Sequence, residues 1–556
     1  MSIRDGCKLK EVLNQIMESK ESVFVRKATG LVREASFFDA AIFTAAFSAP
    51  VGATLAFGIL WSLGAFPGTD IVAATLLSVV LDIPILIMMS LMASSMPRTG
   101  GDYIWVSRII SPPVAIVSNF AATLSALIGA AYWARIWASM GIGPAFSILG
   151  SITGNKVISN IGTAAATSKW TYFLALLLII ILAASLLMGT KKMFKIQNIC
   201  FFIAMFGTVL ALLIFAFGSK STFISNFNSY AQPFTKSQDS YNYIIKAAGA
   251  AGLKLSGGYT FSATVPTIGC IMTFMMWNFW SVYLSGEMKG ASDRKRQESI
   301  MFTALIWDAG FIILGTLLLY RIAGGDFVKA INYLSTNAPK KYPLGVSPYF
   351  NLFAGMITKN QLVNFIITIS FLFWNLPAMV GNTFMPIRTL FAWSFDRILP
   401  EKLSEVNERT HSPIYSIIIV SVIVAAIMTW STFSSAFSTL LSLGVICGVI
   451  VITIVGVAAI AFPFAQKDLY LSSPANVKFL GIPVVIITGV LSILVMAFLT
   501  YLVMTYPALG ISSPILVVEF IVCVVIIGLA IYYIAKFIQR KRGIDIDLAY
   551  KELPPE

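Results

Sequence analysis

The amino-acid sequence predicts an all-helical (all-α) integral membrane protein that crosses the bilayer twelve times. The chain has 556 residues, is 57% hydrophobic and only 12% charged, and has a mean hydropathy of +0.83. A water-soluble fold could not hide so much apolar surface. Twelve apolar runs are long enough to span a membrane. They cover residues 36–61, 70–95, 113–140, 170–189, 196–218, 264–287, 299–321, 361–390, 413–431, 436–461, 480–505 and 514–538.

The basic residues predict the orientation of these spans. A formal net charge of +14 could suggest a nucleic-acid binder, but Lys and Arg gather in alternate connections between the apolar runs. The polar N-terminal segment shows no cleavable signal peptide. We therefore expect a multi-pass protein of the cell (plasma) membrane, with both termini in the cytoplasm, the lipid bilayer around it and no nucleic-acid partner.

The first span is interrupted at its centre. Pro50 has no N–H to give to the carbonyl four residues earlier, and Gly52 weakens the helix further. Freed backbone groups are tolerated in hydrocarbon only where protein or a watery cavity satisfies them. The stretch predicts a helix broken at mid-membrane that could hold a polar solute, with a simple proline kink as the alternative. The candidate binding residues here are Ser48, Ala49, Pro50, Val51, Gly52 and Ala53.

The connection after the second span predicts a short helix along the inner membrane surface, rather than an ordinary loop. Pro97 ends the preceding helix, and Gly100 and Gly101 permit a tight turn. Tyr103 and Trp105 follow directly, and such rings are expected where the membrane surface leaves them half wet.

The sixth and eighth spans carry polar residues at membrane depth. Asn278 is flanked by large rings, and an amide there either hydrogen-bonds a neighbouring helix or belongs to a binding site. Corresponding irregular helices in two halves of a chain point to the binding site of a transporter. The eighth span contains Pro377 and two amides, which favours the transport path over a kinked structural helix. The candidates in the two spans are Thr273, Met276, Trp277, Asn278, Phe279, Trp280 and Asn375.

These segments resemble those of the amino acid–polyamine–organocation (APC) superfamily permeases, in the amino acid permease branch. Besides the broken first span, the resemblance rests on three motifs that occur in order along nearly the whole chain. They are Pro-Arg-Thr-Gly-Gly-Asp-Tyr at 97–103, Gly-Glu-Met-Lys at 286–289, and Arg388…Asp396-Arg397…Leu399-Pro400…Ser412-Pro413. The resemblance implies a LeuT-like fold of two inverted five-helix repeats (5+5) followed by two accessory helices. It also implies a binding site between the first and sixth helices, lined by the third, eighth and tenth.

The resemblance divides the chain into six parts. The outer segment between the repeats is rich in Ser, Tyr, Asn and Gly and is expected to be an irregular extracellular loop. In order, the parts are a cytoplasmic segment 1–35, repeat one 36–218, the extracellular loop 219–263, repeat two 264–461, accessory helices 462–538 and a cytoplasmic tail 539–556.

The chain departs from the family pattern in both helices of the implied site. The family's Gly-Ser/Ala-Gly triplet, whose N–H groups hold a substrate carboxylate, falls at Pro50-Val51-Gly52, and proline supplies no N–H. The carboxylate would then use Val51, Gly52 and Ala53. The family's Phe-x-Gly-x-Glu region falls near 275–279, where Trp277 and Asn278 replace small residues. An amino acid is the expected substrate, and a polyamine or other organic cation is the alternative.

Two acids within the predicted spans are the candidates for coupling transport to an ion gradient. Ionisable residues within spans are energetically expensive and point to function. Asp82 and Asp308 lie in corresponding helices of the two repeats, so H+ is the expected coupling ion. The alternatives are that both acids only pack helices, that the protein is an amino acid exchanger, or that Thr368 or Ser370 belongs to a sodium site.

The sequence therefore predicts a secondary active transporter that moves amino acids, as a proton symporter, by alternating access. The single histidine and five scattered cysteines form no spacing typical of a metal site or a catalytic triad, which argues against an enzyme, a cofactor or a metal. A membrane channel or sensor is the alternative from a different class, but the chain shows neither repeated polar stripes nor a large soluble domain.

Overall fold

The computed structural model describes residues 33–48, 60–254, 258–344, 346–358, 360–434, 437–511 and 513–551. Within these residues, eleven helices are long and apolar enough to cross a membrane, and α2 (Phe37–Ser48) is a shorter apolar helix in the first predicted span. Apart from the two-residue strands β1 (Lys478–Phe479) and β2 (Ile482–Pro483), the regular structure described is helical. The predicted all-helical membrane fold is confirmed.

The long helices follow the predicted order. They are α5 (Ile71–Ser95); α7 (Pro112–Ile136), continued by the π-helical η2 (Trp137–Ile142) and α8 (Gly143–Thr153); α10 (Ser168–Leu187); α11 (Thr190–Phe217); α14 (Phe261–Met275) with η3 (Trp280–Leu284); α15 (Arg294–Ala323); α18 (Gln361–Leu372) with α19 (Asn375–Phe395); α20 (Ile414–Phe433); α21 (Phe437–Ala465); α23 (Val484–Thr505); and α24 (Pro514–Lys541). Several spans exceed their expected bounds, among them the third and the fifth. The third continues to Thr153, and the basic residues expected between the fourth and fifth spans form the first turns of α11.

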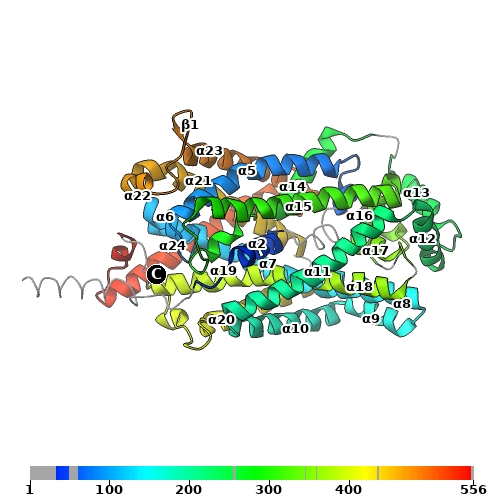
Figure 1. Ribbon diagram of the computed structural model, residues 1–556, viewed down its shortest axis with the longest axis horizontal. Helices are drawn as coiled ribbons and strands as arrows, with labels where there is room; N and C mark the ends of the chain where they lie inside the picture. Colours follow the sequence, from blue (N-terminus) through cyan, green and yellow to red (C-terminus); the bar gives the residue numbers. More distant parts are fainter. Residues whose placement is uncertain are drawn as a thin grey trace, which may run out of the picture.

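The helices run along the long axis of the molecule and leave shorter elements at its two ends (Figure 1). One end carries α6 (Asp102–Ile109), α22 (Lys467–Ser472) and the C-terminal η7 (Ile546–Lys551). The opposite end carries α12 (Lys220–Thr235), α13 (Ser240–Ala250), α16 (Gly325–Asn337) and α17 (Phe350–Gly355). The remaining elements are α4 (Trp61–Ala65), α9 (Lys156–Ala165), η4 (Pro339–Lys341), η5 (Glu401–Ser404) and η6 (Pro507–Leu509). We refer to the first as the α6 end and to the second as the α12 end.

The segment between the fifth and sixth spans is helical, so the prediction of an irregular loop is wrong. Ser219 and Asp239 cap α12 and α13 by accepting hydrogen bonds from the backbone N–H groups of Thr222 and Asn242. Their apolar faces pack on α16, where the Tyr241 ring stacks on Phe327 at a centroid distance of 4.4 Å. Burial of these rings stabilises helices that are too polar to enter a membrane.

The short helix predicted after the second span is α6, and its glycine turn is confirmed. Gly100 and Gly101 have φ of +112° and +53°, a region that residues with a Cβ rarely adopt. The expected half-wet environment for Tyr103 and Trp105 is wrong, because both side chains are fully buried. Tyr103 donates to Asp396 from its hydroxyl at 2.7 Å, and Trp105 donates from Nε1 to the carbonyl of Met96 at 3.2 Å. Each polar ring atom thus has a protein partner instead of water.

Candidate functional site

Helix six is broken between α14 and η3, as its correspondence with the first span predicts. The α-helical pattern ends at Met275, and the chain makes a turn over residues 276–279 before η3 begins at Trp280. Trp277 Nε1 donates to the carbonyl of Thr273 at 3.1 Å, so a side chain satisfies a group near the helix end. Neither Gly nor Pro lies in the turn, and large buried rings fill its surroundings instead.

The end of α2 lies beside this break. A reciprocal pair of hydrogen bonds between Ser36 and Asp39 caps the start of α2. Near its other end, the Phe47 ring stacks on Trp280 at 3.9 Å with an interplanar angle of 8°. Ser48 is the last described residue of the helix. The predicted binding residues Ala49, Pro50, Val51, Gly52 and Ala53 lie outside the described residues.

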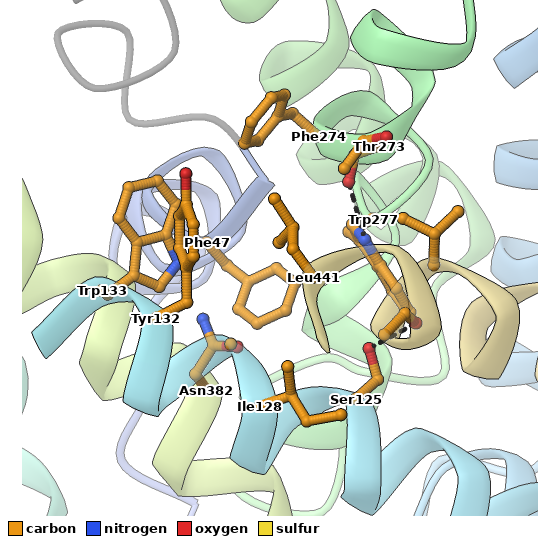
Figure 2. A pocket seen from close by; sticks show the side chains of 13 residues that line it. Phe47, Ser125, Ile128, Tyr132, Trp133, Thr273, Phe274, Trp277, Asn382 and Leu441 are labelled. Atoms are coloured by element: carbon orange, nitrogen blue, oxygen red, sulfur yellow. Dashed lines mark hydrogen bonds between the residues drawn. The ribbon is translucent and has the colours of Figure 1, made fainter. Parts of the chain in front are cut away.

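A cavity of about 50 Å³ lies between these two helices and three others (Figure 2). It is bounded by the end of α2, by α14 and its following turn, and by α7, α19 and α21. Two of the predicted residues, Thr273 and Trp277, line it. The complete described lining is Phe47, Ser125, Ile128, Gly129, Tyr132, Trp133, Thr273, Phe274, Trp277, Asn382, Leu441, Gly444 and Val445.

The cavity wall is aromatic and uncharged. Five of the described lining residues carry aromatic rings, and none of them is Asp, Glu, Lys or Arg. Ser125 donates to the carbonyl of Gly444 at 2.9 Å, and Asn382 donates to the carbonyl of Ala378 at 2.9 Å. Gly129 lets this amide approach α7, because a Cβ there would lie 2.0 Å from Asn382 Oδ1. The wall therefore offers polar atoms and ring faces to a solute, but no fixed charge among its described residues.

The other predicted binding residues lie around the cavity without lining it. Met276, Phe279 and Trp280 are fully buried, and Trp280 Nε1 donates to the carbonyl of Gly381 at 3.0 Å. Asn375 is also buried, with its Nδ2 donating to the carbonyl of Trp133 at 3.1 Å. Asn382, seven residues further along the same helix, reaches the cavity instead.

The cavity residues of α7 and α21 were not among the predicted ones. The resemblance implied that these two helices line the site. Both helices carry polar residues at several positions, among them Asn119, Thr123 and Arg135 on α7 and Ser442 and Thr453 on α21, so polarity alone does not mark which face turns inward. Ser125 and Tyr132, two turns apart on α7, are the residues with hydroxyl groups that α7 contributes to the described lining.

Asp82 lies beside the broken part of helix six. Its side chain is fully buried, and Asn278 Nδ2 donates to Asp82 Oδ2 at 3.4 Å. The other oxygens of the pair, Asp82 Oδ1 and Asn278 Oδ1, have no hydrogen-bond partner among the described residues. Asp308 is equally buried and lies on α15, which packs against both α5 and α2.

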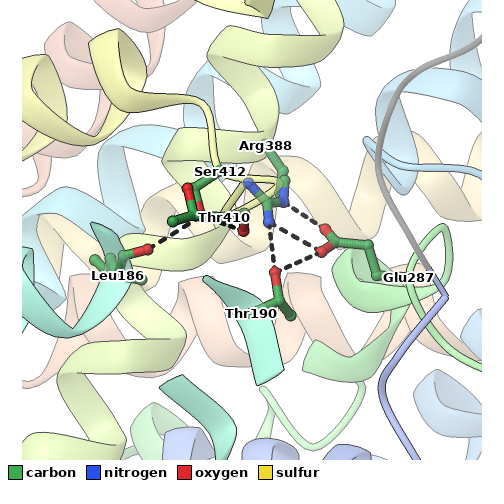
Figure 3. A network of polar contacts seen from close by, with 6 residues as sticks. All are labelled: Leu186, Thr190, Glu287, Arg388, Thr410 and Ser412. Carbon is green, nitrogen blue, oxygen red and sulfur yellow. Dashed lines mark hydrogen bonds and ion pairs between the residues drawn. The ribbon is translucent and has the colours of Figure 1, made fainter. Parts of the chain in front are cut away.

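A buried ion pair joins three helices towards the α6 end (Figure 3). Glu287 follows η3, and Arg388 lies on α19. Arg388 donates from Nε to Glu287 Oε1 and from Nη2 to Oε2 at 2.9 Å, and the Thr190 hydroxyl at the start of α11 donates to Oε2 at 3.0 Å. The backbone of Ala35, just before α2, also bonds to Glu287 and Lys289. We call Thr190, Glu287 and Arg388 the latch.

A second buried network ties the C-terminal η7 to α6 and α19. The Tyr103 hydroxyl bonds to Asp396 and lies 3.0 Å from the Tyr550 hydroxyl. Arg108 Nη2 donates to the carbonyl of Ala549 at 3.2 Å, and its guanidinium lies 5.2 Å from the centre of the Tyr550 ring. The residues of the APC-like motifs thus form the framework of the α6 end, away from the cavity.

Asp102 opens α6 and is enclosed by α7. The Ser118 hydroxyl donates to Asp102 Oδ2 at 2.6 Å, and Asn119 Nδ2 donates to Oδ1 at 2.8 Å. Burial raises the pKa of Asp102 from 3.8 to about 6, although both hydrogen bonds favour the charged form. Its carboxyl group therefore changes charge close to physiological pH.

No described residues form a group of three or more His, Cys, Asp or Glu side chains that could hold a metal ion. A comparison with protein-family models matches residues 36–530 to a family described as amino acid permease. A comparison with curated proteins found no match. The match covers most of the chain and agrees with the helical architecture. The chain therefore belongs to the amino acid permease family of the APC superfamily, whose members are multi-pass membrane transporters and not enzymes.

Proposed function

We propose that this protein is a secondary active transporter that carries a zwitterionic amino acid by alternating access. The observation that carries the proposal is the uncharged, ring-lined cavity at the junction of α2 and the broken sixth helix. Broken helices in a membrane expose backbone groups that can replace the hydration of a polar solute. Among the sequence candidates outside the described residues, Val51, Gly52 and Ala53 would supply N–H groups to the carboxylate.

The lining favours an amino acid over a polyamine or another organic cation. A desolvated ammonium group without a nearby anion is strongly disfavoured, so a cation-specific site needs a carboxylate. The described lining contains none, and Asp82 lies behind the turn of helix six instead. An amino acid carries its own carboxylate, and its ammonium group can face carbonyl groups and aromatic rings.

Access from the α6 end would require two contacts to separate. The first is the stack of Phe47 on Trp280, which adjoins the cavity. The second is the latch, because Glu287 follows helix six whereas Arg388 belongs to α19. The sequence assigns this end to the cytoplasm. We propose that both contacts close the cytoplasmic route and part when the substrate is released inside.

We propose that a proton couples to transport at Asp82. A buried carboxylate held by one amide at 3.4 Å is poorly stabilised. If Asp82 is protonated, its O–H can donate to Asn278 Oδ1 while Asn278 Nδ2 donates back, which satisfies both partners in one ring of hydrogen bonds. Asn278 adjoins the cavity residue Trp277 in the chain. Loss of the proton would therefore disturb the turn that shapes the cavity. Asp308 on α15 is the second candidate.

Transport by the purified protein in liposomes tests the substrate. Uptake of a mixed pool of radiolabelled neutral amino acids should exceed that of the diamine putrescine, and an inward proton gradient should stimulate it. Preferential uptake of putrescine would overturn the amino acid proposal. Labelling of single cysteines placed near residue 545 and on α12, in right-side-out vesicles, tests the predicted orientation. Only the α12 site should react with an impermeant reagent.

A further inference from the structure

Gly448 on α21 packs directly against the cavity residue Trp277. A Cβ added at Gly448 would lie 2.6 Å from Trp277 Cη2 and 2.8 Å from Cζ2, and 2.6 Å from the Met276 methyl. Real Cβ atoms do not come this close to ring carbons, so the Cζ2–Cη2 edge of the indole lies against bare backbone. At Gly444, one turn earlier on the same helix, an added Cβ would meet only Ile128 and Ser125 at 3.7 Å, an ordinary contact.

The indole is held on its other sides. Its Nε1 donates to the carbonyl of Thr273 at 3.1 Å. The Trp280 ring meets it edge-on at a centroid distance of 5.3 Å, and the Phe47 ring does so at 6.1 Å. The cavity is the open space beside Trp277, so a group that displaces the indole from Gly448 must push it towards the cavity (Figure 2).

We infer that Gly448 determines the size of the substrate side chain, by setting how far Trp277 projects into the cavity. The inference rests on the proposed amino acid transport. Ile128, Phe274, Leu441 and Val445 supply the apolar part of the wall, which assigns an apolar side chain to the substrate. Gly448 does not line the cavity itself. It acts on the substrate only through Trp277 and is a positioning residue.

The test is the size profile of transport in Gly448→Ala. The purified variant and wild type are compared in liposomes for uptake of alanine, valine, leucine and phenylalanine, each under the same gradient. The methyl group should lower kcat/KM for the largest amino acid that wild type carries about tenfold or more relative to alanine, since removing space for one methylene group has effects of this size. An equal loss of kcat/KM for every amino acid, or an unchanged dependence of kcat/KM on side-chain size, would overturn the inference.

Two further variants separate a size effect from poor folding. In Gly448→Ala with Trp277→Phe, the clashing Cη2 and Cζ2 atoms are gone, so uptake of the larger amino acids should recover relative to the single Gly448→Ala variant. If uptake of the larger amino acids does not recover in the double variant, the role of the indole is contradicted. Gly456→Ala places a Cβ 2.8 Å from Ile493 on α23, further along the same helix and away from Trp277. It should change all uptake rates in parallel. If wild type carries none of the four amino acids, the proposed substrate fails and not the role of Gly448.

Discussion

At the scale of single residues, the latch is an ion pair enclosed within the protein. The side chains of Glu287 and Arg388 are 2% and 4% exposed, so water screens neither charge. Two-pronged contact between guanidinium and carboxylate, with Thr190 as a further donor, offsets the loss of hydration. Such a pair adds little to the stability of the fold compared with apolar residues of the same shape. Removing one partner is strongly destabilising, because the other charge is then buried without a counter-ion.

Glu287→Gln should therefore destabilise the protein by about 3–5 kcal/mol, because it leaves the Arg388 charge buried without a counter-ion. The apparent melting temperature in detergent measures the effect. Glu401→Gln is the matched control, since Glu401 pairs with Arg397 but is 64% exposed, and such pairs contribute little. Equal effects of the two substitutions would contradict the buried role of the latch. Glu287→Met with Arg388→Met should recover part of the loss.

Asp102 gives a pH dependence of stability. Its pKa is higher in the folded protein, about 6, than the ordinary 3.8, so the folded state binds the proton more tightly. The group's contribution to stability is therefore fully present below pH 3.8, is lost as the pH rises through about 6, and is constant above that range.

The measurement is the melting temperature of wild type and Asp102→Asn in detergent between pH 4 and 8. The melting temperature of wild type minus that of Asp102→Asn should fall across pH 4–6 and then level off, because asparagine does not titrate. A difference that is constant over the whole range would show that Asp102 does not take up a proton on folding.

At the scale of elements, the broken sixth helix illustrates what side chains alone can do. Its turn contains no helix breaker, and the sequence pointed to it only through Asn278 and the correspondence with the first span. The structure adds the side-chain contacts that hold the turn. Trp277 donates a hydrogen bond to the carbonyl of Thr273, Trp280 donates to the carbonyl of Gly381, and Asn278 donates to Asp82. Gly381 and Asp82 belong to distant parts of the chain, and a sequence pattern does not display contacts with them.

The helices at the α12 end were missed for a different reason. The composition of their segment is polar, and an amphipathic helix outside the membrane lacks the long apolar run that marks a span. The signal was present in the spacing of Phe223, Phe227 and Tyr230, which places three rings on one helical face. Ser219 and Asp239 are also residue types that typically cap the start of a helix, as they do here.

Phe327→Ala should loosen this end as a unit. The ring is fully buried and packs against Phe223, Phe227, Tyr241 and Phe353. Its removal should cost about 3–5 kcal/mol. Hydrogen exchange of the amides of α12, α13 and α16 should then accelerate together. Phe234→Ala, at a ring that is 46% exposed on α12, is the control and should leave exchange unchanged. Acceleration confined to α16 would contradict cooperative packing of the three helices.

At the scale of the whole molecule, the α6 end is held by the chain's own C-terminal segment. Asp547 bonds to Tyr532 and Lys536 of α24, which turns η7 back towards the helices. Ala549 then packs on Phe391 and Phe395 of α19. The sequence treats this tail as an appendage because its residues are polar and its partners lie far along the chain.

Tyr550→Ala should release the segment. The substitution removes a buried ring and its contacts with Tyr103 and Arg108, so trypsin should cleave after Lys551 or Arg542 faster in detergent solution. Leu548→Ala is the matched control, because Leu548 lies in the same η7 but is 42% exposed. Cleavage rates that remain equal in wild type and Tyr550→Ala would contradict a docked C-terminal segment.

The class of fold, the order of the spans and the family were predictable because hydrophobic length and short motifs are local properties. The family motifs did not mark the cavity. Glu287, Arg388, Tyr103 and Asp396 form contacts at the α6 end, whereas Gly129, Gly444 and Gly448 shape the cavity by lacking side chains. A glycine in an apolar helix looks the same whether it faces lipid or a substrate. Only the packing of α7, α19 and α21 distinguishes a glycine that faces the cavity from one that faces lipid.

The most direct test of the account is to separate coupling from substrate movement in Asp82→Asn. Asparagine keeps the size of the side chain but cannot exchange a proton. Two rates are measured in liposomes: amino acid uptake driven by an inward proton gradient, and exchange of labelled for unlabelled amino acid without a gradient. We expect the variant to lose the gradient-driven uptake and retain the exchange. Gradient stimulation that persists in Asp82→Asn would contradict proton coupling at this residue.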